Sequence, residues 1–276
     1  MNRQFATALR SCYNTAMARR KSYKAIAEYY DAENARHRVL EEDVPFFMGQ
    51  LPRRRQSILE LAVGTARAAI PLAQAGHRVV GVDYAGDMLE IGRRKRDAVG
   101  LSEKQLSLLE ADALTLDLKQ KFDWVCVFFN TFLVFTTLQQ QDAAMQTIVR
   151  HLKPRGRFWI DIFQPDLNLL AQSHRTDLDP AVFFLPRFDR TVLKNTEIRR
   201  GTEPQIQHVT FHYTWFGPHG QEHREKTQFD ITYIFPRELQ MLVERHGLKI
   251  EHLWGNYDGS RVMPDSPRII ARCCRA

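Results

Sequence analysis

The sequence contains no apolar run that approaches the roughly 18 residues of a membrane-spanning helix, so we expect no membrane span. Only four cysteines occur, and they lack the spacing of metal ligands: Cys12, Cys126, Cys273 and Cys274. We therefore expect no metal site, and reduced thiols of the kind found in cytoplasmic proteins. Hydrophobic residues make up 44% of the 276 residues, which is enough to bury one large core with a smaller appended layer.

Acidic residues are absent from residues 1–27, which hold six of the 39 Lys and Arg residues. The rest of the chain then has 33 basic against 32 acidic residues, a net charge of +1, whereas the whole sequence carries +7. Because nucleic-acid binding usually gives one face of a domain an excess of positive charge, this balance disfavours nucleic acid as a partner. The basic segment has one apolar helical face, so it is either an amphipathic helix that closes over a site, which we favour, or a transit peptide.

A buried strand, a tight turn and a helix are predicted around Gly64. The apolar run Ile58–Val63 predicts the strand, which breaks at Gly64 and passes into a helical pattern. A second apolar strand ends in Asp83, 19 residues after Gly64. This is the arrangement of a nucleotide-binding βαβ unit, in which the turn permits close approach of a ligand and the acid binds ribose hydroxyls.

Glycine is scarce in this turn. Dinucleotide-binding loops have three glycines, whereas only Gly64 remains here and Ala62 and Ala66 occupy the outer positions. Glu60 would repel the phosphates that a helix N-terminus otherwise attracts. The turn therefore favours a ligand with a positive or neutral face and argues against a nicotinamide-dependent oxidoreductase. A strand-to-helix turn of some other α/β protein is the alternative.

Four motifs follow one another along the sequence: ELAVGTAR at Glu60–Arg67, GVDYAGDML at Gly81–Leu89, EADA at Glu110–Ala113 and LKPRG at Leu152–Gly156. In these motifs and their order, the chain from about Tyr23 to Ala276 resembles class I S-adenosylmethionine-dependent methyltransferases of the small-molecule type. The resemblance implies an α/β fold with a Rossmann-like, doubly wound, mostly parallel seven-stranded sheet, an antiparallel β insertion and N-terminal lid helices. It also implies a helical lid over residues 1–45 and a methyltransferase domain over 46–276, with 163–235 as the substrate-side β insertion.

The insertion is predicted to contain a half-buried pair of strands. Alternating polar and apolar residues predict strands over 205–216 and 226–235. The stretch 161–200 is predicted as a short helix and a loop with two prolines. Strands over 248–254 and 268–274 are predicted to close the main sheet.

By this resemblance the cofactor is S-adenosyl-L-methionine, and the residues that bind it belong to the motifs, the lid and the end of the fourth strand. They are Tyr23, Tyr30, Glu60, Ala62, Gly64, Arg67, Asp83, Tyr84, Met88, Asp112, Ala113, Phe129 and Asn130. Asp83 would accept hydrogen bonds from both ribose hydroxyls, and Arg67 would meet the cofactor carboxylate.

Several of these residues have a structural alternative. Asp112 binds the adenine amino group or caps the turn that follows it. Tyr23 and Tyr30 cover the methionine end, where aromatic faces attract a cation, or they pack in the core. Asn130, at the carboxyl end of the fourth strand, orients a substrate or caps the next helix.

The implied reaction is methyl transfer to a nitrogen or oxygen of a small molecule, which depends mainly on positioning and desolvation. Asn130, Asp161 and Tyr213 are the predicted catalytic contributors, and none is identified as a general base. One alternative is an RNA methyltransferase, disfavoured because the sequence has no Asn-Pro-Pro-Tyr-type motif and no paired catalytic cysteines. Another is a non-catalytic S-adenosylmethionine-binding protein. The acceptor and the oligomeric state do not follow from the sequence.

Overall fold

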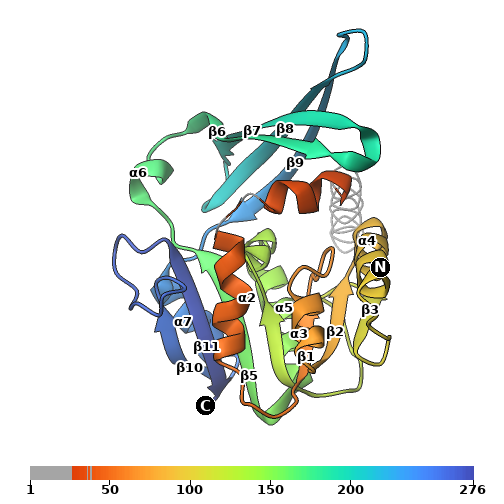
Figure 1. Cartoon of the computed structure of the whole chain (residues 1–276). Coiled ribbons are helices and arrows are strands. Elements are labelled where there is room, and N and C mark those ends of the chain that lie inside the picture. Colours follow the sequence, from red (N-terminus) through yellow and green to blue (C-terminus); the bar gives the residue numbers. More distant parts are fainter. Residues whose placement is uncertain (1–26, 36, 38) are drawn as a thin grey trace, which may run out of the picture.

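The computed structural model describes residues 27–35, 37 and 39–276, so Tyr23 and nearly all of the basic segment lie outside the described residues. A seven-stranded sheet with the order β10-β11-β5-β4-β1-β2-β3 forms the centre of the molecule (Figure 1). Its strands are β1 (Ser57–Leu61), β2 (Arg78–Asp83), β3 (Leu106–Glu110), β4 (Phe122–Val127), β5 (Leu152–Phe163), β10 (Leu248–Trp254) and β11 (Arg268–Arg275). β1 to β5 pair in parallel, and β11 is antiparallel to both β5 and β10. The predicted Rossmann-like, mostly parallel sheet is confirmed.

The central strands are almost continuously apolar because helices cover both faces of the sheet. These helices are α2 (Val39–Gly49), α3 (Ala69–Gln74), α4 (Gly86–Ala98), α5 (Leu138–His151) and α7 (Pro236–Arg245). On one face α5 and α7 contribute Ile148 and Leu239 to a buried apolar cluster. On the other face α2, α3 and α4 contribute Phe47, Leu72 and Leu89 to a second cluster. The sheet is therefore packed between two layers of helices, and the loops at its carboxyl end extend from this packed core.

A second, four-stranded antiparallel sheet is inserted between β5 and α7. It consists of β6 (His174–Leu185), β7 (Arg190–Arg200), β8 (Ile206–Phe216) and β9 (Glu222–Thr232), paired in sequence order. The short helices α6 (Leu167–Leu170) and η2 (Pro186–Phe188) flank β6. The predicted antiparallel insertion is confirmed, although its last strand begins at Glu222 rather than at residue 226.

The prediction of a loop between the short helix and Arg200 was wrong, because β6 and β7 occupy that stretch. Pro180 lies in β6, an edge strand, within the break in pairing register between Leu178 and Ala181. Proline cannot donate to a ladder, so an edge or an irregularity is where a strand tolerates it. Pro186 begins η2 between the two strands. The two prolines therefore mark a strand irregularity and a turn.

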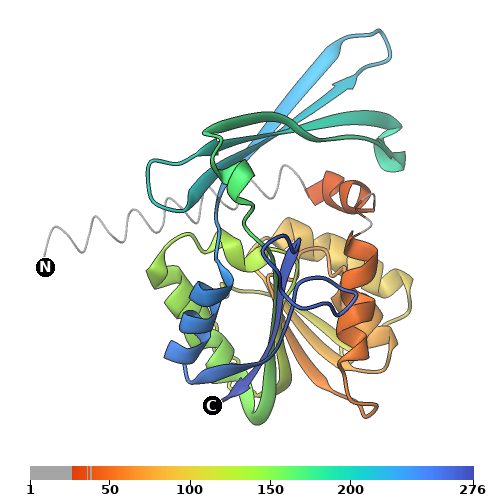
Figure 2. The same cartoon turned by 90° about the vertical axis from the view of Figure 1, so that its left-hand side faces the viewer.

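The antiparallel sheet lies over the carboxyl ends of the parallel strands, and a helix of residues 27–34 lies between them (Figures 1 and 2). Tyr29 packs in a cluster with Phe183 and Tyr213 of the antiparallel sheet. Ala27 packs on the other side against Ala85 and Met88 of the main domain. This helix confirms an N-terminal helical element between the two sheets, whereas the predicted domain boundary at residue 45 stays a prediction. In the described part of the chain, no helix has the length and apolarity needed to span a membrane.

Candidate active site

The turn after β1 has the backbone shape of a glycine-rich loop although it contains one glycine. Ala62, Gly64 and Ala66 have φ angles of 52°, 56° and 61°. The left-handed conformation costs a non-glycine residue about 1–2 kcal/mol. Such strain persists where the surrounding structure holds it, and it is commonest at functional sites. The two alanines therefore adopt a backbone conformation that favours glycine.

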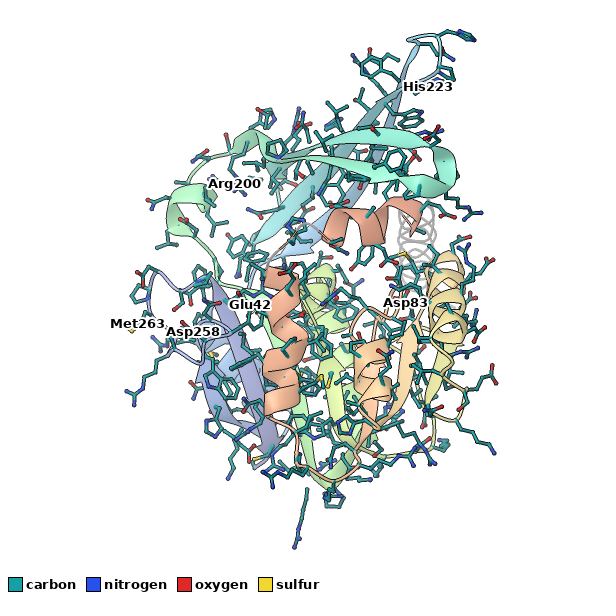
Figure 3. All side chains as sticks on the ribbon, viewed as in Figure 1. Glu42, Asp83, Arg200, His223, Asp258 and Met263 are labelled. Atoms are coloured by element: carbon teal, nitrogen blue, oxygen red, sulfur yellow. The ribbon has the colours of Figure 1, made fainter. Side chains whose placement is uncertain are left out.

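Asp83, at the carboxyl end of β2, fixes this turn (Figure 3). Its Oδ2 atom accepts a hydrogen bond of 2.8 Å from the Gly64 N–H, and its Oδ1 atom accepts one of 2.8 Å from the Ala85 N–H. The side chain is buried, and burial raises its pKa while the backbone donors oppose that rise. Each oxygen of a carboxylate has a second lone pair, so Asp83 can still accept from a ligand hydroxyl.

Glu60 lies beneath the same turn, 4% exposed, and its Oε2 atom has no hydrogen-bond partner. Burial, assisted by Asp43 and Asp83 and opposed by Arg67, raises the pKa of Glu60 to about 8. Arg67 is itself held by Asp43, whose Oδ1 atom lies 2.8 Å from Nη1. The expected contact of Arg67 with a cofactor carboxylate stays a prediction. Glu60 is therefore a buried acid that stays protonated near neutral pH unless a positive group lies beside it.

The helix of residues 27–34 covers this turn. Tyr30 packs with Tyr84 and Met88, and a Cβ atom placed on Gly64 would lie 3.7 Å from the Met88 Cε atom. Burial raises the pKa of the Tyr30 phenol. The structure therefore brings four of the predicted cofactor-binding residues together.

Sequence reasoning missed the polar contact that fastens the helix to the turn. The Thr65 hydroxyl donates a hydrogen bond of 2.6 Å to Asp31 Oδ1, and Lys95 Nζ donates one of 2.9 Å to Oδ2. Asp31 directly follows Tyr30 in the stretch that resembles the family, which was the available signal. Thr65 belongs to the ELAVGTAR run, so one bond joins the two motifs.

Asp112 follows β3 and caps the next turn, because its Oδ1 atom accepts a hydrogen bond of 2.8 Å from the Leu114 N–H. The capping alternative is confirmed, and the adenine contact stays a prediction. Ala113 is buried beside Leu116 in the core cluster. Asp83 ends β2 and Asp112 lies just after the neighbouring strand β3. The Ala111 N–H donates a hydrogen bond of 2.9 Å to the Asp83 carbonyl and so joins the two strand ends.

A second left-handed turn follows β4. Phe129 and Asn130 have φ angles of 42° and 63°. The Asn130 side chain does not cap the following helix η1 (Thr131–Val134), so that alternative was wrong. Its Oδ1 atom accepts a hydrogen bond of 2.7 Å from the Phe163 N–H instead, and its N–H donates to the Asp161 carbonyl over 2.9 Å. Asn130 thus joins the carboxyl ends of β4 and β5.

Asp161 is 1% exposed and already has strong partners. Arg268 Nε donates to its Oδ1 atom over 3.0 Å, and the Tyr257 hydroxyl donates to Oδ2. Burial, followed by the Asp161 charge, raises the pKa of Tyr257. An acid bound in this way is poorly placed to take a substrate proton. The catalytic role of Asp161 stays a prediction.

Tyr213 lies apart from the predicted site residues of the main sheet, although Tyr30 packs against the apolar cluster that contains it. It is fully buried on β8, and its hydroxyl donates to Glu33 Oε2 over 3.2 Å. Its ring lies 4.9 Å from that of Tyr29. Tyr29 and Glu33 lie on the side of their helix opposite Asp31, which faces the cofactor turn. A catalytic role for Tyr213 stays a prediction, and its contacts lie between the helix and the antiparallel sheet.

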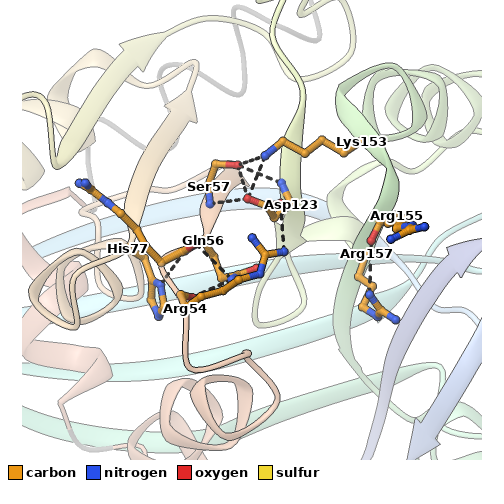
Figure 4. Close-up of polar contacts among 9 residues, drawn as sticks. Arg54, Gln56, Ser57, His77, Asp123, Lys153, Arg155 and Arg157 are labelled. Atoms are coloured by element: carbon orange, nitrogen blue, oxygen red, sulfur yellow. Dashed lines mark hydrogen bonds and ion pairs between the residues drawn. The ribbon is translucent and has the colours of Figure 1, made fainter.

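A separate polar cluster lies at the amino ends of the strands, away from this site (Figure 4). The Ser57 hydroxyl donates to Asp123 Oδ2 over 2.7 Å, and Lys153 Nζ donates to the same atom over 3.0 Å. These bonds link the starts of β1, β4 and β5. No three His, Cys, Asp or Glu side chains among the residues that the structure describes come together as metal ligands.

Comparison with known proteins agrees with this geometry. Residues 58–156 match a family described as a methyltransferase domain. Cypemycin N-terminal methyltransferase of a Streptomyces species is 32% identical over 114 residues, which are 41% of this chain and 44% of that protein. Demethylmenaquinone methyltransferase of Thermus thermophilus is 35% identical over 152 residues, which are 52% of this chain and 64% of that protein. The chain therefore spans less than two thirds of either relative.

Among solved structures, the CcbJ methyltransferase from Streptomyces caelestis superposes with a TM-score of 0.74. The superposition covers 91% of this chain and 96% of that chain at 22% sequence identity, so it establishes a common fold. Residues 58–156 thus match a methyltransferase domain, and the chain shares the fold of a solved methyltransferase, as expected from its motifs.

Proposed function

We propose that this chain is an enzyme that transfers a methyl group from S-adenosyl-L-methionine to a nitrogen or oxygen of a small-molecule acceptor. The observation that carries the proposal is Glu60, a buried acid with an unpartnered oxygen beside the left-handed turn at Gly64. An unpartnered buried charge is costly, so burial raises the pKa of Glu60 to about 8 and the ligand-free protein holds this carboxyl protonated near neutral pH. A cationic group of a ligand at this turn would favour the ionised carboxylate, and the ammonium and sulfonium groups of S-adenosylmethionine are cationic.

The remaining groups at the carboxyl ends of β1 to β4 suit the rest of this cofactor. Asp83 has lone pairs that can accept hydrogen bonds from ribose hydroxyls. Asp112 and Ala113, just after the neighbouring strand, would contact the adenine. Tyr30 and Met88 would cover the bound molecule and exclude water. When bound, the cofactor supplies a methyl group on a positively charged sulfur.

The protein's own contribution to the reaction would be positioning. An acceptor enclosed between the antiparallel sheet and the end of β4 would approach the methyl group in line, which accelerates the reaction without a protein nucleophile. Asp161 is bound by Arg268 and Tyr257. These contacts support an acceptor whose nucleophilic atom needs no strong base.

The charge of the chain supports a small molecule rather than a nucleic acid as acceptor. The chain apart from its basic N-terminal segment is close to electrically neutral. The two relatives are named for different acceptors, cypemycin and demethylmenaquinone, so their names favour methyl transfer without selecting one acceptor. We further propose a cytoplasmic location, because Cys126, Cys273 and Cys274 are free thiols in the described part of the chain, as is usual in a reducing compartment.

Calorimetric titration with S-adenosylmethionine tests the cofactor, with NAD as the control ligand. We expect saturable binding to the wild-type chain, binding at least about tenfold weaker to Asp83→Asn, and no binding of NAD. The matched control is Asp87→Asn, an exposed acid in the first turn of α4, which should bind as the wild type does. Absence of binding to the wild type would refute the proposal. Formation of S-adenosylhomocysteine with a panel of small amines and hydroxyl compounds then tests turnover, and binding without turnover would indicate a non-catalytic protein.

A further inference from the structure

The ligand side of the main sheet is bounded by two strained turns. Strand order reverses between β4 and β1, which is where ligands bind in open parallel sheets. Ala62 and Ala66 follow β1 in left-handed conformation, and Phe129 and Asn130 follow β4 in the same conformation. Backbone strain of this kind persists only where other contacts hold it. The contacts around Phe129 and Asn130 therefore indicate what maintains the shape of the β4 side.

Three contacts hold the turn after β4. The Asn130 N–H donates to the Asp161 carbonyl over 2.9 Å, and the Phe163 N–H donates to Asn130 Oδ1 over 2.7 Å. The Arg268 guanidinium lies over the Phe129 ring, 5.0 Å from its centre. Two of these contacts come from Asp161 and Arg268, which are themselves an ion pair.

That ion pair is buried and has a third member. Arg268 donates to Asp161 Oδ1 from both Nε and Nη2, and Tyr257 donates to Oδ2. Asp161, Arg268 and Tyr257 are 1%, 5% and 7% exposed. A buried ion pair is often no more stabilising than apolar residues of the same volume, because desolvation offsets the attraction. Overall stability is therefore a poor explanation for this cluster, whereas fixed geometry at the neighbouring turn is a direct consequence of its contacts.

We propose that Asp161, Tyr257 and Arg268 form a positioning network that holds the left-handed turn after β4 in the shape required by the cofactor. Asp161 fixes the turn through its carbonyl, and Arg268 fixes it through the Phe129 ring. Tyr257 donates a hydrogen bond to the second carboxylate oxygen and so keeps the ion pair oriented. The inference rests on the proposed function, because it takes S-adenosylmethionine to be the ligand that meets the turn.

A double-mutant cycle on the affinity for S-adenosylmethionine tests the network. The variants are Arg268→Lys, Asn130→Ala and their combination, each titrated calorimetrically and each checked by thermal unfolding. Arg268→Lys keeps the charge but loses the planar, two-bond contact with Asp161. We expect each single change to weaken binding about tenfold, and the double variant to bind about tenfold rather than a hundredfold more weakly, because both act through one turn.

Arg272→Lys is the matched control. Arg272 lies on the same strand, pairs with Glu251 over 3.2 Å and lies 5.8 Å from the centre of the Trp254 ring, but contacts neither Phe129 nor Asn130. Arg272→Lys should leave the affinity for S-adenosylmethionine within about twofold. In the double variant with Asn130→Ala, the fold-changes of the two single variants should multiply. If Arg268 had a merely structural role, the losses in affinity of Arg268→Lys and Asn130→Ala would also multiply in the double variant.

The possible results separate the two proposals. If the wild type binds no S-adenosylmethionine, the proposed function fails and this inference with it. If the wild type binds and Arg268→Lys binds equally well, or if the two effects multiply, only the positioning network is refuted. Should Arg268→Lys fail to fold, Tyr257→Phe removes a single hydrogen bond and enters the same cycle, with unchanged affinity counting against the network.

Discussion

Replacing Glu60 by glutamine is predicted to make the stability of the ligand-free protein less dependent on pH. Burial raises the pKa of Glu60 from 4.5 to about 8. Between these values the folded state holds a proton on Glu60 that the unfolded state has released. The free energy of unfolding of the wild type therefore falls as the pH rises through this window. Glutamine has no proton to lose and removes this contribution.

The size of the effect follows from the shift in pKa. A rise of 3.5 units corresponds to about 5 kcal/mol, taking about 1.4 kcal/mol per unit. Relative to the wild type, Glu60→Gln should gain this amount between pH 4.5 and pH 8 and nothing more at higher pH. Any fixed cost of burying an unpaired amide enters equally at every pH, so it cancels from the change.

Urea unfolding of both proteins between pH 4.5 and pH 9, without ligand, measures the difference. Glu90→Gln, an exposed position on α4, is the matched control and should show no comparable trend. A stability difference between Glu60→Gln and the wild type that stays constant over this range would refute the reasoning. The same substitution should weaken S-adenosylmethionine binding above pH 8, because the neutral amide no longer attracts a cationic ligand group.

Three further predictions concern the turn, the helix that covers it and the antiparallel sheet. Ala62→Gly should raise the free energy of unfolding by about 0.5–1 kcal/mol in urea, because glycine adopts positive φ without strain; a loss of stability would contradict the assigned backbone. Thr65→Val removes the hydroxyl that bonds Asp31 and should speed amide exchange in residues 27–34, while unchanged exchange would show that this bond does not fasten the helix. Tyr213→Phe should lower stability by about 1 kcal/mol and leave the affinity for S-adenosylmethionine within about twofold, and a tenfold loss would place Tyr213 in the ligand site.

The main sheet was predictable because its signals are local. Apolar runs of five or six residues each end in a recognisable turn, and Gly64 and Asp83 mark the first and second of them. The tight turn at Gly64 also followed from sequence, whereas the left-handed backbone of Ala62 and Ala66 was not predicted, because alanine rarely adopts it. The antiparallel sheet was predicted in part. Strong alternation of polar and apolar residues indicates β8, whereas Pro180 led to the prediction of a loop where β6 lies.

The contacts of the site were less predictable because they join distant parts of the chain. Arg67 was expected to face a ligand, but Asp43 of α2 lies close enough to hold it. Asp161 and Arg268 are 107 residues apart, and their pairing depends on β11 lying beside β5. Neither spacing nor residue type specifies such a pairing before the strand order is known.

The helix of residues 27–34 is synthesised long before the strands that it contacts. Its partners in the antiparallel sheet follow late, with Lys194 161 residues after Glu33 and Glu225 196 residues after Tyr29. At typical rates of about 5–20 residues per second, the helix leaves the ribosome roughly 10 to 40 seconds before those partners exist. Strands β1 to β5 are made within that interval. The turns after β1 to β4 are therefore synthesised before the strands that complete them, and the last third of the protein adds β10 and β11 to the main sheet as well as most of the sheet over the helix.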